Sequence, residues 1–283
     1  MTSASPTTLA SPTTSAGFDP QAAYAVVTHL AEGIGPREAS GPAYRAAADY
    51  VAGRFAALGY QVDRMAFPVP AGVSWGVRVP AGASQNVIAT PAGFDPDAPH
   101  RLVGAHLDTV PQAPGAEDNG SGVAVLVELA RLAAAEHLSV PVVFVAFGAE
   151  EPRGSGDTQH HFGSQALVAA MPPAQRAKLA GMLSLDRVGV PTDVLPVCHG
   201  GRAAGAVRSA LVSAAARAGV PAQACVDRAS DHWSFEQAGL DAARIGKVPF
   251  DGYHSPGDVP SVVEPAQLQR TAAVAWSWLS SPI

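Results

Sequence analysis

Positive charge is scarce in this sequence and is nowhere clustered. The 283 residues contain 18 Lys and Arg against 24 Asp and Glu, which gives a formal net charge of -6. Because phosphate binding depends on clustered Lys and Arg, we expect no nucleic-acid partner. The lack of basic runs also argues against binding to an anionic membrane surface. No charge-free apolar run reaches about 18 residues, so we expect no membrane span.

Cysteine is equally scarce. Cys198 and Cys225 are the two cysteines and form no C-x-x-C pair, so a four-thiolate metal site is excluded. Two free thiols are the simpler interpretation, and one disulfide is the alternative. Lys and Arg are absent before Arg37, and no sustained apolar segment occurs near the start. We therefore expect no secretory signal and take the protein to be cytoplasmic.

The composition changes once along the chain. Residues 1–17 contain the near-duplicates SASPTTLA and LASPTTSA, which are rich in Ser, Thr and Pro. Such a segment cannot bury enough apolar surface to offset its ordering entropy, so we expect a disordered tail. The remaining residues, 18–283, fit the length of a single large domain.

Apolar periodicity alternates between the strand and the helix pattern through most of this domain. Strands are expected at 86–89, 102–106, 140–147, 181–185 and 242–245. Helices are expected at 19–32, 44–58, 121–136, 201–218, 233–237 and 265–279. The repeated order of strand and helix predicts an α/β sandwich with a mostly parallel sheet. Ligand sites in such folds lie beyond the carboxyl ends of the strands.

Polar residues follow several of the expected strands. His106 and Asp108 end one strand, and residues two apart in extended chain face the same way, so Asp108 can accept a hydrogen bond from the imidazole. Taken alone, a surface pair is the simpler interpretation. Asp118 lies in a Gly-rich turn before a helix, where a helix cap is the alternative.

Glu150 and Glu151 end the most apolar strand in the sequence. Two adjacent carboxylates at the end of a buried strand repel each other, and their burial is costly without cations between them. We therefore interpret this pair as functional. By contrast, His160 and His161 lie in a Gly/Ser-rich loop, and a solvated pair that rims a cleft is the simpler interpretation.

Two further segments complete the set, one around Asp186 and Arg187 and one around Tyr253 and His254. Together, the five segments supply two His, several carboxylates and one spare Glu. This is the ligand set that two hard or borderline divalent ions require. The signatures of serine hydrolases, H-E-x-x-H zinc proteases, P-loop proteins and dinucleotide-binding proteins are absent.

The motifs HLD, AEDNGSG, GAEE, LDRVG, SDH and GYH occur in this order. In that order they resemble the co-catalytic zinc aminopeptidases, the family of bacterial leucyl aminopeptidases, glutamate carboxypeptidase-type enzymes and glutaminyl cyclases. The resemblance implies one catalytic domain with a twisted, mixed sheet between helices. It also implies two zinc ions per chain, which activate a shared water molecule to hydrolyse peptide or amide bonds.

The resemblance also assigns roles to individual residues. Asp118 would bridge the two metals, with a cis peptide bond between it and Asn119. The other metal ligands would be His106 and Asp186 at one site, and Glu151 and His254 at the other. The remaining roles are Glu150 as general base, Asp108 orienting His106, Tyr253 stabilising the oxyanion, and Arg228 and Asp231 binding substrate. Ser230 and Asp231 can also be interpreted as helix caps.

An aminopeptidase acting on peptides or amino-acid amides is the leading hypothesis, because carboxylate-rich walls attract the α-ammonium group of a substrate. Arg187 and Arg153 depart from the family pattern near the cleft. They could bind a substrate carboxylate, which would favour a carboxypeptidase, a dipeptidase or an N-acyl amino acid hydrolase. The sequence is also compatible with a one-zinc glutaminyl cyclase-type acyltransferase and with a binding protein that has lost activity.

Overall fold

The computed structural model describes residues 17–202 and 204–283. The tail expected over 1–17 therefore lies, apart from Gly17, outside the described residues. Among the described helices, none has the length and apolar character needed to cross a membrane.

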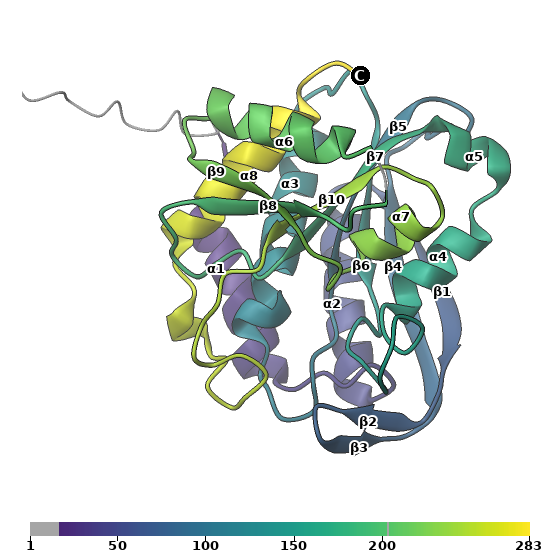
Figure 1. The fold of residues 1–283 in the computed structure, drawn as a ribbon, viewed down its shortest axis with the longest axis vertical. Coiled ribbons are helices and arrows are strands. Elements are labelled where there is room, and N and C mark those ends of the chain that lie inside the picture. Colours follow the sequence, from purple (N-terminus) through teal and green to yellow (C-terminus); the bar gives the residue numbers. More distant parts are fainter. Residues whose placement is uncertain (1–16, 203) are drawn as a thin grey trace, which may run out of the picture.

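The described residues build one mixed sheet with helices on both faces (Figure 1). In spatial order its eight strands are β1 (Gln61–Val69), β4 (Gly82–Thr90), β6 (Val142–Phe147), β5 (His100–His106), β7 (Leu179–Asp186), β10 (Ala242–Gly246), β8 (Leu195–His199) and β9 (Ala222–Val226). Four of the seven neighbouring pairs in this described sheet are parallel, and three are antiparallel. The prediction of a mixed, mostly parallel sheet between helices is confirmed. A separate hairpin of β2 (Gly72–Ser74) and β3 (Val77–Val79) projects from one end of the molecule.

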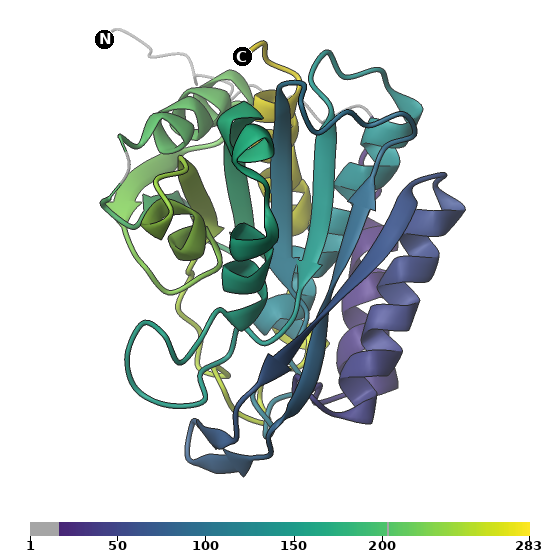
Figure 2. The same ribbon diagram turned by 90° about the vertical axis from the view of Figure 1, so that its right-hand side faces the viewer.

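Helices form the two outer layers (Figures 1 and 2). One face of the sheet packs against α1 (Pro20–Thr28), α2 (Pro42–Ala57), α3 (Gly122–Ala135), α6 (Ala206–Arg217) and α8 (Pro265–Leu279) in the larger apolar core. The other face packs against α4 (Phe162–Ala170) and α7 (His232–Gln237), and α5 (Pro173–Lys178) leads from α4 into β7. The central strands β5 and β6 are buried throughout. Strands buried on both faces read as continuous apolar runs, which is why both were predictable.

Several elements differ from the sequence-based expectation. The strands β1, β8 and β9, the β2–β3 hairpin, and the helices α4 and α5 were not predicted. The two edge strands β1 and β9 are largely exposed, so they lack the apolar pattern that marks a buried strand. The helix expected over 201–218 is shorter, because α6 begins at Ala206.

Strand register brings the chemically active residues to one end of the sheet. His106 pairs with Phe147 at the ends of β5 and β6, and Glu150 and Glu151 follow directly. Gly104 pairs with Ser184, so Asp186 ends β7 at the level of His106. Parallel pairing therefore gathers ligands from three neighbouring strands at their carboxyl ends.

The two cysteines form a disulfide, so the expectation of two free thiols is wrong. Cys198 lies on β8 and Cys225 on β9, where they are direct partners in the parallel register. Their Cα atoms are 4.3 Å apart, and no described cysteine is free. The pairing depends on two strands that were not predicted, which is why the sequence left it open.

Removing this disulfide should destabilise the fold. The bond closes a loop with a sequence separation of 27. Chain-entropy arguments assign about 3–4 kcal/mol to a loop of this length, because the cross-link restricts the unfolded chain. We expect the double variant Cys198→Ala/Cys225→Ala to lose free energy of unfolding of this order in urea titrations at fixed zinc. Equal stability of the variant and the oxidised wild type would contradict the prediction.

Candidate metal centre

The predicted ligands meet at the carboxyl end of the sheet, although they come from five segments. His106 and Asp186 end β5 and β7, and Glu151 follows β6. Asp118 lies in the turn Ala116–Ser121 ahead of α3, and its peptide bond to Asn119 is cis, as predicted. His254 lies in the loop after β10. All five side chains are at most 7% exposed.

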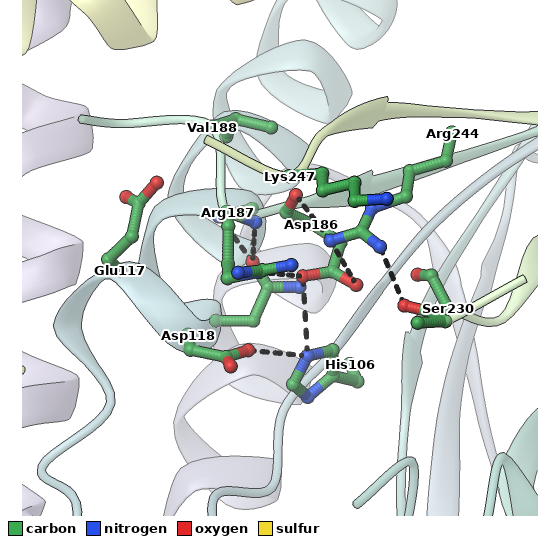
Figure 3. A network of polar contacts seen from close by, with 12 residues as sticks. His106, Glu117, Asp118, Asp186, Arg187, Val188, Ser230, Arg244 and Lys247 are labelled. Atoms are coloured by element: carbon green, nitrogen blue, oxygen red, sulfur yellow. Dashed lines mark hydrogen bonds and ion pairs between the residues drawn. The ribbon is translucent and has the colours of Figure 1, made fainter. Parts of the chain in front are cut away.

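Asp118 lies between two clusters of ligand atoms. Its Oδ1 is 3.1 Å from His106 Nε2, which is 3.7 Å from Asp186 Oδ1 (Figure 3). Its Oδ2 is 3.0 Å from His254 Nε2, which is 3.4 Å from Glu151 Oε1. One carboxylate thus faces both histidines, as expected for a residue that bridges two metals.

These distances fit zinc. Tetrahedral coordination with bonds of 2.0–2.1 Å places neighbouring ligand atoms about 3.3 Å apart. The described ligand atoms fall into two groups, His106 with Glu150 and Asp186, and Asp118 with Glu151 and His254, and within each group they lie within 4.8 Å of one another. Asp186 Oδ1 is buried and has no hydrogen-bond partner among the described residues. Imidazole nitrogens and carboxylate oxygens are suitable ligands for a divalent cation. A bound cation would also give the buried oxygen of Asp186 the partner that it lacks.

Electrostatics point the same way. Burial raises the pKa of Glu150 and of Glu151 to about 8. Burial lowers the pKa of His254, but hydrogen bonds to Asp118 and Glu151 outweigh this effect and raise it to about 9. The cluster therefore favours added positive charge, which a proton or a metal cation can supply.

Asp108 acts differently from the prediction. Its Oδ1 is 3.8 Å from His106 Nδ1, beyond hydrogen-bond distance. The imidazole Nδ1 instead lies 3.1 Å from the backbone carbonyl oxygen of Asp108. The Asp108 carboxylate accepts the backbone N–H groups of Glu150 at 3.0 Å and Glu151 at 3.1 Å. Asp108 thus fixes the Glu pair with its side chain and His106 with its backbone.

The loop that carries Asp118 is held by contacts of Asp258, Asn119 and Gly122 that the motifs did not predict. The Asp258 carboxylate accepts the backbone N–H groups of Glu117 at 2.7 Å and Asp118 at 3.0 Å. The Asn119 amide donates to the carbonyl of Leu185 at 2.8 Å. A Cβ atom at Gly122 would lie 2.3 Å from that same carbonyl oxygen, so the start of α3 approaches β7 closely only because the residue is glycine. Of these contacts, only that of Asp258 had a signal in the sequence, because Asp258 lies four residues after the expected ligand His254.

Arg244 is a second contribution that the sequence did not reveal. Its guanidinium is fully buried, and its Nη2 lies 3.2 Å from Asp186 Oδ2 (Figure 3). Nη1 donates to Asp227 Oδ1 at 2.9 Å. Arg244 therefore balances one oxygen of Asp186 and leaves the other, Oδ1, directed at His106 and the metal site.

His161 is not solvated, contrary to expectation. Its side chain is 1% exposed, and its Nε2 lies 3.0 Å from Glu150 Oε1. His160 contacts the same nitrogen, with its Nδ1 3.0 Å from His161 Nε2. Burial lowers the pKa of His161 to about 3, so a neutral imidazole contacts Glu150. The histidine pair thus belongs to the wall of the site.

A cavity of about 250 Å³ opens onto both ligand clusters. Beyond the ligands and Glu150, its lining residues are Trp75, Pro152, Gly154, Gly156, His160, His161, Arg187, Ala229 and Tyr253. The rings of Tyr253 and His254 stack at 3.7 Å, and Trp75 from the β2–β3 hairpin meets His254 at 4.2 Å. The hairpin thus supplies an aromatic wall that the sequence did not predict.

The two expected substrate-binding residues do not line this cavity. Arg228 donates to the carbonyl of Gly200 at 2.9 Å and lies over the ring of Trp233. Asp231 is fully buried and occupies the N-cap position of α7, but its side chain makes no capping hydrogen bond. Ser230 lies one residue before that position, and its Oγ is 2.8 Å from Ser184 Oγ.

Comparisons with known proteins agree with this geometry. Leupeptin-inactivating enzyme 1 of Streptomyces exfoliatus is 29% identical over 254 residues, which cover 88% of this chain and 49% of that protein. Aminopeptidase YwaD of Bacillus subtilis is 31% identical over 189 residues, 61% of this chain and 40% of that protein. The chain therefore spans half or less of the length of these two relatives.

Solved structures share the fold. BSAP, a zinc aminopeptidase from Bacillus subtilis, superposes with a TM-score of 0.82 at 19% identity, covering 92% of this chain and 94% of that one. A glutaminyl cyclase from Bacteroides thetaiotaomicron superposes with a TM-score of 0.78 at 20% identity, covering 94% and 99%. Peptidase family M28 matches residues 86–279, which contain all six motifs. The resemblance predicted from those motifs is confirmed, and the chain belongs to peptidase family M28.

Proposed function

We propose that this chain is a two-zinc exopeptidase, and that it acts as an aminopeptidase releasing N-terminal residues from peptides or amino-acid amides. The observation that carries the proposal is the pair of ligand clusters joined by Asp118, with Glu150 beside them in the same cavity. A single structural ion would need neither the second cluster nor a further carboxylate facing the cavity.

His106 and Asp186 would hold one zinc ion, Glu151 and His254 the other, and Asp118 would bridge them. Such a pair of zinc ions, when bound, polarises the scissile carbonyl and makes an attacking water more acidic. The buried carboxylates would hold the positive charge of the zinc ions in a setting of low dielectric, where that charge acts strongly on a substrate.

Glu150 is the group placed to move a proton. Its backbone is fixed by Asp108, and its Oε1 is held by His161 at 3.0 Å. A carboxylate held in this way can accept the proton of the attacking water and then donate it to the leaving amine. His161 is a positioning residue in this scheme, because it touches Glu150 and not the reacting atoms.

Tyr253 supplies a hydrogen-bond donor in the cavity lining. Its ring stacks on His254 and lies in the lining of the cavity. A phenol remains protonated at neutral pH and can donate to the carbonyl oxygen as negative charge develops there. The carboxylates of the centre would attract the α-ammonium group of the first substrate residue, which favours an exopeptidase over an endopeptidase.

A substrate screen with metal analysis tests the proposal. Zinc-supplemented protein should release p-nitroaniline from aminoacyl p-nitroanilides, with two zinc ions per chain. The same screen includes N-acyl amino acids, blocked dipeptides and a peptide with N-terminal glutamine. Cyclisation of that glutamine by a protein with one zinc ion, without hydrolysis of any peptide or amide, would replace the hydrolase by the acyltransferase. Absence of every turnover with both zinc ions bound would refute both.

The cytoplasmic location stays a prediction. The Cys198–Cys225 disulfide weighs against it, since structural disulfides persist mainly in oxidising compartments.

A further inference from the structure

Arg187 is a cationic side chain in the cavity wall whose donors are unused. It lines the cavity and is 11% exposed. None of its side-chain N–H groups makes a hydrogen bond to the residues that the structure describes, and its Nε lies 3.9 Å from Asp186 Oδ1. A guanidinium carries five N–H donors and cannot lose its charge in a protein, so this group keeps donors without a described protein partner beside the reaction centre.

The neighbouring carboxylate does not need Arg187 as a counter-charge. Arg244 already contacts Asp186 Oδ2 at 3.2 Å and also donates to the Asp186 carbonyl at 3.3 Å. The remaining oxygen, Oδ1, is directed at the ligand cluster of His106. A purely structural role for Arg187 in balancing Asp186 would therefore duplicate an interaction that is already complete.

The orientation of Arg187 is set by its backbone and by Tyr253. Its backbone N–H donates to Asn119 Oδ1 at 3.2 Å, and its φ of 57° lies in the left-handed region that favours glycine. Arginine thus occupies a position where glycine would be less strained. Its Cζ lies 4.4 Å from the centroid of the Tyr253 ring, which covers one face of the guanidinium. Stacking of this kind leaves the donor edge free for a planar, bidentate partner.

Arg153, the other arginine near the Glu pair, does not share this property. Its Nη1 donates to the carbonyls of Pro70 at 2.8 Å and Pro80 at 2.6 Å, and its Nη2 pairs with Glu38. Arg153, in the loop after β6, thus binds the two chain segments that flank the β2–β3 hairpin. Arg187 is therefore the single Lys or Arg among the described residues that line the cavity.

We propose that Arg187 receives a carboxylate of the substrate, so that the enzyme prefers substrates carrying a carboxylate close to the scissile bond. The inference rests on the proposed peptidase function and adds a substrate class to it. Two substrates present this chemistry: a peptide whose N-terminal residue is Asp or Glu, and a dipeptide or N-acyl amino acid with a free terminal carboxylate. Arg is suited to both, because its fork matches the two oxygens of a carboxylate.

Matched substrate pairs distinguish the two sources. Glutamyl and glutaminyl p-nitroanilides differ in a side-chain carboxylate, whereas leucyl-glycine and leucyl-glycine amide differ in a terminal one. Hydrogen bonds to charged groups correspond to about a 10- to 100-fold effect, so wild-type kcat/KM should favour the charged member of at least one pair by that factor. The pair that shows the preference identifies the source.

The variant Arg187→Gln tests whether this preference depends on the guanidinium. It should reduce the charged-to-neutral ratio of kcat/KM by about 10- to 100-fold, mainly through KM, with zinc content unchanged. Arg217→Gln is the matched control: Arg217 is exposed on α6, so its loss removes the same charge away from the cavity and should leave the ratio unaltered. Arg187→Lys should restore part of the ratio, because it keeps the charge but not the fork.

Two results would overturn the inference while leaving the peptidase function intact. One is a wild type that hydrolyses the charged and neutral members of both pairs equally well. The other is an Arg187→Gln variant that slows both members by the same factor, which would place Arg187 in the reaction itself or in the structure. By contrast, a zinc-loaded wild type that hydrolyses no member of either pair would count against the proposed function first.

Discussion

Glu150→Gln should lower kcat for peptide or anilide hydrolysis by about 10²- to 10⁴-fold, the usual contribution of a general base. Glutamine keeps the size of the side chain and its reach to His161, which lies 3.0 Å from Glu150 Oε1. It cannot accept the proton of the attacking water. Two zinc ions per chain and an unchanged melting temperature are expected, because His106, Asp118 and Asp186 still provide one metal site and Glu151 is untouched. Stopped assays with elemental analysis on the same sample measure both quantities.

Glu151→Gln is the matched comparison, since the two residues are neighbours of the same type. Glu151 Oε1 lies 3.4 Å from His254 Nε2, within the second ligand cluster. This variant should lose zinc from one site and also lose stability, because its remaining ligands are buried. Near-full activity of Glu150→Gln with both metals bound would show that another group moves the proton. Loss of zinc from Glu150→Gln would instead make Glu150 a ligand, since it lies in the cluster of His106 and Asp186.

The gathering of polar residues at one end of the sheet could be predicted from local sequence pattern. His106 and Asp186 follow continuous apolar runs, and a buried parallel strand has such a run. Parallel strands place their carboxyl ends at one edge, so these two residues meet although they are far apart in the sequence. The family resemblance carried by the six motifs then proposed a site for each ligand. The structure groups His106 and Asp186 with Glu150, and Glu151 and His254 with Asp118.

The supporting contacts could not be predicted, because they join side chains that are distant in sequence and have no periodic signal. Arg244 reaches Asp186 across 58 residues, and Asp258 reaches Asp118 across 140. His161 was placed in solvent because its loop is rich in Gly and Ser, yet the loop folds back and the backbone N–H of His161 donates to the Glu150 carbonyl at 2.8 Å. In each case tertiary packing determines which residue the side chain or backbone contacts, and local composition does not predict that contact.

Removal of zinc should lower both the activity and the stability of the protein. The four carboxylates of Asp118, Glu150, Glu151 and Asp186 face one small cavity and are at most 8% exposed. Binding of a ligand to the folded state stabilises it by about 2.7 kcal/mol when the free ligand is at 100 times its Kd. For a chain of this size that corresponds to a rise in melting temperature of roughly 4–5 °C per saturated site. Chelated protein should therefore be inactive and melt earlier, and added zinc should restore both.

Asp118→Asn tests whether the two sites are joined. Asp118 is the one described residue whose two carboxylate oxygens lie near both ligand histidines, at 3.1 Å and 3.0 Å. Replacing one oxygen by an amide weakens both sites at once, so zinc content should fall from two to below one, and the zinc-dependent rise in melting temperature should largely disappear. Asp63→Asn, an exposed change on the edge strand β1, is the control for lost charge and should keep two zinc ions. If Asp118→Asn lost one zinc ion and bound the other as tightly as before, Asp118 would belong to a single site and the two clusters would be independent.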